Sequence, residues 1–155
     1  MRLSERFITI PLIESKDVGS SGIDSDGVNL GLLHNFCAVF VFGAITGDSV
    51  LKVYAGATAA KTTAIAFKYR FGAADFKVAL ADQLGTETAV ASTGLTLTAA
   101  TFDHRMVTIE IDPQSMPDGK GWVTFEINST ATVMNVGAVG FGDTRSGGNV
   151  NASVL

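Results

Sequence analysis

Few side chains in this 155-residue sequence could do chemistry, since it contains two histidines and one cysteine. His34 and His104 lack the i, i+4 spacing of a zinc-binding helix, and no pair of cysteines accompanies them. The string Gly19-Ser20-Ser21-Gly22 lacks the Gly-x-Ser-x-Gly spacing of a serine-hydrolase elbow. Cys37 lies in an apolar run, where we expect a small side chain buried on both faces and unreactive.

Two short stretches partly match ligand-binding loops. Lys61-Thr62 is like the end of a phosphate-binding loop, but Ala55 and Ala60 stand where that loop needs glycines. Asp24-Ser25-Asp26-Gly27 is like the start of a calcium loop, but its glycine comes too early and the final bidentate glutamate is missing. We expect polar turns at both places, with a weak cation site as the alternative at the second. The sequence therefore predicts no catalytic residue, metal site or cofactor, and a protein that is not an enzyme.

The charge balance argues against two classes of partner. The net charge is −4 and charged residues make up 17% of the chain, below the ~25% of soluble domains. No stretch gathers Lys and Arg, as a nucleic-acid surface or an anionic-membrane surface requires, so we expect neither partner. The N-terminus lacks the apolar stretch of a signal peptide, and no apolar run approaches the ~20 residues that span a bilayer. Synthesis in a cytoplasm is expected.

Hydrophobic residues alternate with polar ones along much of the chain, as in half-buried strands. Strands are predicted over residues 36–42, 49–54, 66–71, 94–98, 106–112, 122–128 and 132–141. The first is apolar on both faces, which indicates a central strand or one covered by a partner. Gly137 and Gly140 predict a bulge or a close backbone approach in the last. One short helix is expected after Asp75, because Phe76, Ala79, Leu80 and Gln83 share a stripe.

Many short strands separated by glycine-rich turns predict an all-β fold, a β-sandwich or jelly roll with extended N- and C-terminal arms. We expect an N-terminal strand and flexible arm over residues 1–31, the β-sandwich domain over 32–141 and a C-terminal tail over 142–155. The apolar strand within residues 1–12 cannot bury both faces alone. It should pair with the edge of a sheet, either its own or a neighbour's.

Three strings resemble small virion proteins of tailed bacteriophages. They are LTLTAATFDHRMVTIEID at residues 95–112, TGDSVLKVYAG at 46–56 and SERFITIPL at 4–12. The proteins they resemble are capsid decoration (cement) proteins, which have a β-sandwich or jelly-roll fold and bind the outer face of the shell. The resemblance implies a structural protein that is made in the host bacterial cytoplasm, resides on the capsid surface of the virion and stabilises the phage head. It carries over no catalytic residues.

The partners that the resemblance implies are the major capsid protein and further copies of this chain, as a homotrimer or homodimer. The apolar residues that we assign to assembly are Leu3, Phe7, Ile8, Ile10, Phe36, Phe40 and Phe42. Two alternatives remain. One is a head-fibre, spike or tail-associated jelly-roll module that binds host glycans, for which Trp122 is the candidate stacking residue. The other is an enzyme with an unrecognised site.

Overall fold

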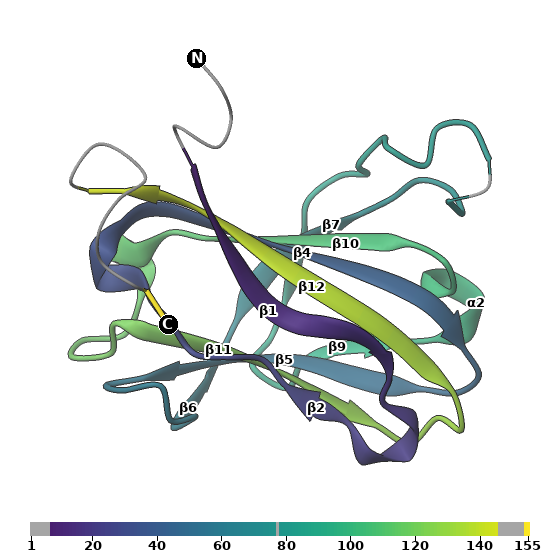
Figure 1. Ribbon diagram of the computed structural model, residues 1–155, viewed down its shortest axis with the longest axis horizontal. Coiled ribbons are helices and arrows are strands. Elements are labelled where there is room, and N and C mark those ends of the chain that lie inside the picture. The colour runs from purple at the N-terminus through teal and green to yellow at the C-terminus, as the bar shows by residue number, and fades with distance from the viewer. Residues whose placement is uncertain (1–6, 77, 146–153) are drawn as a thin grey trace.

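The computed structural model describes residues 7–76, 78–145 and 154–155. Two antiparallel six-stranded sheets pack face to face as a β-sandwich (Figure 1). Sheet A has the order β1 (Phe7–Asp17), β12 (Met134–Thr144), β4 (Leu33–Ile45), β10 (Met106–Ile111), β7 (Phe67–Phe71) and β8 (Thr88–Val90). Sheet B has the order β2 (Ile23–Asp24), β11 (Trp122–Ser129), β5 (Ser49–Gly56) and β6 (Thr63–Ile65), with β3 (Val28–Asn29) beside β11 and β9 (Leu95–Leu97) beside β5. The all-β prediction is confirmed.

Short helical turns connect these strands. They are η1 (Gly19–Ser21), η2 (Leu30–Leu32), α2 (Ala99–Phe102) and η3 (Pro113–Ser115). Each segment predicted to be a strand overlaps one of the observed strands. The run at residues 36–42 lies within β4, which is hydrogen-bonded to β12 on one side and to β10 on the other. Among the described residues, no helix is long and apolar enough to cross a membrane.

Aromatic rings fill the space between the sheets. On β4 the side chains of Phe36, Phe40 and Phe42 are buried, and they alternate with residues that point outward. The ring of Phe125 on β11 meets that of Phe40 edge to face, with centroids 5.2 Å apart. Full burial of each such ring contributes roughly 1.5–3 kcal/mol to the free energy of unfolding. The buried aromatic side chains on one face of β4 therefore hold the two sheets together.

The structure corrects the assignment of apolar residues to assembly. Ile10, Phe36, Phe40 and Phe42 are at most 2% exposed and lie in the core between the sheets, so a partner of the folded domain cannot reach them. Phe7 and Ile8 on β1 are partly exposed. Leu3 lies outside the described residues.

The helix predicted after Asp75 is wrong. Residues 72–85 instead connect the neighbouring strands β7 and β8 and return on themselves, with the backbone N–H of Ala73 donating to the carbonyl of Gln83. A ten-residue helix separates its ends by about 15 Å. Neighbouring strands lie only about 4.8 Å apart, so the pairing of β7 with β8 overrides the helical stripe.

The N-terminal strand pairs with the edge of its own sheet. β1 is antiparallel to β12 and buries Ile10, Leu12 and Ile13 in the core. Its register shifts after Pro11 and again after Ile13, and the carbonyl of Leu12 accepts a hydrogen bond from Asp26. Of residues 1–31, which we assigned to a strand and arm, the described part contributes β1, β2 and β3 to the two sheets.

Candidate interaction surface

The outward side of sheet A carries an uncharged patch at its centre. Strand register brings Val139 opposite Val39, Gly137 opposite Val41 and Phe141 opposite Cys37. β1 adds Thr9 and Pro11 on one side, and β10 adds Met106 and Thr108 on the other. We call this set of ten residues the outer face; its members are Thr9, Pro11, Cys37, Val39, Val41, Met106, Thr108, Gly137, Val139 and Phe141.

The outer face departs from the usual pattern of a solvent-facing sheet, which alternates apolar residues inside with polar residues outside. Val41 and Val139 are 45% and 38% exposed, which places them among the most exposed large apolar side chains of the described residues. Four strands about 4.8 Å apart and about five residues of ~3.4 Å give the patch an area of roughly 330 Å². Apolar patches of a few hundred Å² on a monomer often mark interaction sites.

Charged side chains border the outer face along β10, β7 and β8. Glu110 lies opposite Cys37 on one side and Lys68 on the other. The Lys68 ammonium is 2.7 Å from the Glu87 carboxylate, and this hydrogen bond holds the pKa of Glu87 below its usual range. The polar border and apolar centre resemble the rim and core of a protein interface.

Cys37 is half-buried within the outer face, which corrects the expectation that it is buried on both faces. Removal from water raises the pKa of its thiol to about 11, and the nearby negative charge of Glu110 adds to the effect. The thiolate is the nucleophilic form of cysteine, and it is scarce near neutral pH at such a pKa. The geometry therefore makes Cys37 part of a contact surface rather than a nucleophile.

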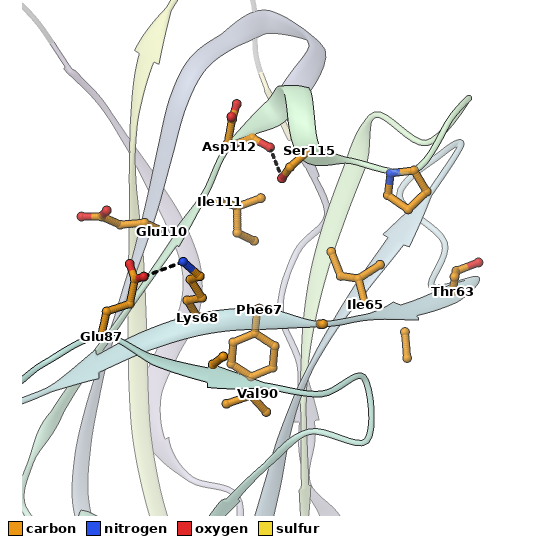
Figure 2. A pocket seen from close by; sticks show the side chains of 14 residues that line it. Thr63, Ile65, Phe67, Lys68, Glu87, Val90, Glu110, Ile111, Asp112 and Ser115 are labelled. Atoms are coloured by element: carbon orange, nitrogen blue, oxygen red, sulfur yellow. Dashed lines mark hydrogen bonds and ion pairs between the residues drawn. The ribbon is translucent and has the colours of Figure 1, made fainter.

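A pocket of about 760 Å³ opens where the chain crosses from β6 in sheet B to β7 in sheet A (Figure 2). Ile65, Phe67, Val90 and Ile111 give it apolar walls. The Lys68–Glu87 ion pair, Glu110 and Asp112 lie at its polar side. A second hollow of about 430 Å³ adjoins it, shares Glu87, Glu110, Ile111 and Asp112 with it, and extends to Phe7, Cys37 and Phe141.

The structure does not bring the predicted chemistry-bearing residues together. His34 lies near the start of β4, whereas the backbone N–H of His104 donates to Gly43 near its end. No group of three or more His, Cys, Asp or Glu side chains is placed to hold a metal ion within the part of the chain that the structure describes.

Asp24, from the calcium-like string, pairs with Lys61 from the phosphate-loop-like string. The Lys61 ammonium is 2.8 Å from Asp24 Oδ1 and 2.7 Å from Glu126 Oε1, while the Tyr54 hydroxyl donates to Glu126 Oε2. The hydrogen bond from Lys61 holds the pKa of Glu126 below its usual range. This network ties residues 57–62 to sheet B.

Trp122 does not form an aromatic platform with Tyr54. Both point to the outer side of sheet B, where Thr124 lies directly opposite Tyr54 of β5 and two residues from Trp122 along β11. The Thr124 hydroxyl donates to the carbonyl of Ala59, and Thr124 is only 5% exposed. Residues 57–62 therefore cover Thr124, the neighbour of both rings, where a sugar that stacked on the two of them would have to lie.

Sequence reasoning missed the outer face as a site. The available signal was the run at residues 36–42, apolar at odd as well as even positions, which predicted either a central strand or a covered one. The structure shows a central strand whose odd positions reach the surface.

No family model and no curated protein matches the chain. Among solved structures, the SPBc2 prophage-derived protein YomS is similar at 15% identity and a TM-score of 0.45, over 88% of this chain and 94% of that chain. A structure of infectious bursal disease virus, Gx strain, is similar at 14% identity and a TM-score of 0.20, over 90% of this chain and 42% of that one. Desmodium yellow mottle tymovirus is similar at 10% identity and a TM-score of 0.17, over 96% and 91% of the two chains. All three TM-scores are below 0.5, so the β-sandwich assignment rests on the strands of this chain.

Proposed function

We propose that this chain is a structural protein of a phage virion, and specifically a decoration protein that binds the outer surface of the capsid and stabilises the head. Its partners are the major capsid protein and other copies of itself. The observation that supports this function best is the outer face, an uncharged patch on a six-stranded sheet with Val41 and Val139 exposed at its centre. The resemblance of three strings to phage decoration proteins points the same way.

The size of the outer face fits binding through many repeated contacts. Its roughly 330 Å² is less than half of the ~800 Å² that each partner buries in a standard stable interface. If the whole area counted as apolar surface, its burial at ~25 cal/mol per Å² would contribute at most roughly 8 kcal/mol, against an association cost of 4–15 kcal/mol or more. A single copy therefore binds weakly through this surface alone. Copies linked to one another on a repeating shell bind far more tightly, because each further contact is intramolecular.

Co-sedimentation with phage heads tests the proposal. Heads purified from a phage that lacks this gene are mixed with the purified chain or with the double variant Val41→Lys, Val139→Lys. We expect the wild type to bind, and the variant to lose at least tenfold in affinity because two lysines face the shell unpaired. The matched control is Val50→Lys on the outer side of sheet B, which should bind like the wild type.

Two results would count against the proposal. One is a wild-type chain that does not sediment with heads. The other is a double variant that stays folded by circular dichroism and binds as well as the wild type, which would remove the outer face from the contact.

A further inference from the structure

The two hollows beside sheet A adjoin and form one groove across its strands. The pocket of about 760 Å³ and the hollow of about 430 Å³ share Glu87, Glu110, Ile111 and Asp112. Strand pairing places Glu110 of β10 between Cys37 of β4 and Lys68 of β7. From Phe141 on β12 to Ala89 on β8 the groove crosses neighbouring strands over roughly 19 Å. We call the two hollows together the acidic groove.

Carboxylates outnumber cations in the acidic groove. Of the described residues that line it, four are acidic and only Lys68 is basic, which gives a net charge of −3; the acidic residues are Glu87, Glu110, Asp112 and Asp143. The whole chain has a net charge of −4, so the groove holds most of the excess. The one ammonium group is 2.7 Å from the carboxylate of Glu87. Within the described part of the chain, the other three carboxylates form no ion pair with a lysine or an arginine.

Apolar side chains form the wall that faces these charges. Figure 2 shows Ile65 on the opposite side of the pocket from Glu110 and from the ion pair of Lys68 with Glu87. An extended segment points successive side chains in opposite directions. Lysine and arginine also combine an apolar stem with a charged end. The groove therefore fits a segment whose apolar side chains contact one wall while the alternate, basic side chains reach the carboxylates.

We propose that the acidic groove binds an extended segment of the capsid protein in which lysine or arginine alternates with apolar residues. Cys37 and Phe141 line the groove and also belong to the outer face, so the two surfaces are continuous. A segment of about six residues covers the roughly 19 Å of the groove. The inference rests on the proposed function for the identity of the partner. It adds the charge complementarity by which that partner is selected.

Peptide binding tests the groove without phage heads. The probe is a synthetic peptide of about six residues, acetylated and amidated at its ends, in which lysine alternates with valine. One comparison peptide replaces lysine by glutamate, and another replaces valine by serine. Changes in the amide chemical shifts of the isotope-labelled chain report binding. We expect the lysine–valine peptide to bind most tightly, and its dissociation constant to rise with salt concentration because salt screens the charges.

Two variants locate the binding in the groove. The double variant Glu110→Gln, Asp112→Asn removes two carboxylates but keeps the oxygen at residue 112 that accepts a backbone N–H, and it should weaken binding about fivefold. Ala89→Trp fills the pocket from an exposed position on its wall and should abolish binding. The control Glu14→Gln, Asp48→Asn changes the net charge equally at exposed positions outside the groove and should bind like the wild type.

Several results would overturn the inference. They are a lysine–valine peptide that does not bind, a comparison peptide that binds as tightly, and a folded Glu110→Gln, Asp112→Asn variant with wild-type affinity. Ala89→Trp is also added to heads, where weaker co-sedimentation is expected. A folded Ala89→Trp chain that sediments like the wild type would remove the groove from the contact and leave the capsid role standing. A wild type that binds the peptide but not the heads would overturn the proposed function and with it the identity of the partner.

Discussion

Cys37 lies in the outer face, and the pKa of its thiol decides its reactivity. Burial and the charge of Glu110 raise the pKa of the thiol from 9.0 to about 11. A pKa higher by two units reduces the thiolate fraction near neutral pH about a hundredfold, and the more basic thiolate recovers part of this loss through its higher nucleophilicity. Labelling should therefore be about tenfold slower than for an unperturbed thiol. The rate of reaction with a thiol reagent, followed from pH 7 to 11, should still be rising near pH 11.

Glu110→Gln provides the control for this prediction. It removes the smaller of the two causes, so labelling should become faster but should stay slower than that of a free cysteine. Rapid labelling of the native wild type at pH 8 would contradict the account.

Asp17 fixes the end of β1 to the start of β12. Its Oδ1 accepts hydrogen bonds from the backbone N–H of Met134 at 2.8 Å and of Gly19 at 2.9 Å, and these hold the pKa of the carboxyl below its usual range. A lowered folded-state pKa stabilises the fold fully above pH ~4, the value in unfolded chains, and this stabilisation is lost as the pH falls through the folded pKa.

The variant Asp17→Asn tests this pH dependence. Urea unfolding should show a lower midpoint for the variant than for the wild type at pH 7, and the difference should shrink as the pH falls below 4. Asp118→Asn, which changes an exposed carboxylate in the loop before β11, should leave the midpoint unchanged at pH 7. A difference that is the same at pH 7 and pH 3 would show that the charge of Asp17 contributes nothing.

At the scale of the strand, a side chain larger than hydrogen has no room at Gly140 of β12. A Cβ at Gly140 would lie 2.7 Å from the ring of Phe36, whose side chain fills the space. The sequence predicted a bulge or a close backbone approach here, whereas the atoms that fill the space at Gly140 belong to the side chains of Phe36 and Ile10. Gly140→Ala should displace that ring and lower the free energy of unfolding by about 1–3 kcal/mol. Gly121→Ala, where the nearest atom is 4.0 Å away, should change it little.

Period-two patterns predicted the strands well because burial of one face was enough to define them. At residues 122–128, for example, Val123, Phe125 and Ile127 are buried as the alternation requires. The loop at residues 72–85 could not be predicted in this way. Its apolar residues do recur at helical spacing in the sequence. The conformation of the loop is nevertheless decided by the short distance between β7 and β8, and that distance follows from the pairing of the two strands.

The candidate site was harder to predict than the fold. Phe40 and Val41 are both apolar, so residue type alone does not show which of them is buried. The orientation of β4 in the sandwich places the Phe40 side chain in the core and the Val41 side chain at the surface. Strand register then assembles the outer face from β1, β12, β4 and β10, which are far apart in the sequence. The alternation within each strand predicts which of its residues share a face, but it does not predict which strands become neighbours.

At the scale of the whole molecule, the described chain is one double sheet whose outer face is apolar at its centre. In the function that we propose, the outer face of sheet A contacts the shell. The described C-terminal residues add to the sandwich itself, because Val154 is buried and its carbonyl accepts a hydrogen bond from Asn29 on β3.

Electron cryo-microscopy of phage heads tests the central claim most directly. Heads from a phage that lacks this gene are imaged alone and after addition of the purified chain, and the two maps are subtracted. The account predicts repeated density on the outside of the shell, into which the sandwich fits with sheet A toward the capsid and Val41 and Val139 at the contact. Density restricted to fibres or the tail, or no added density on the shell, would contradict it.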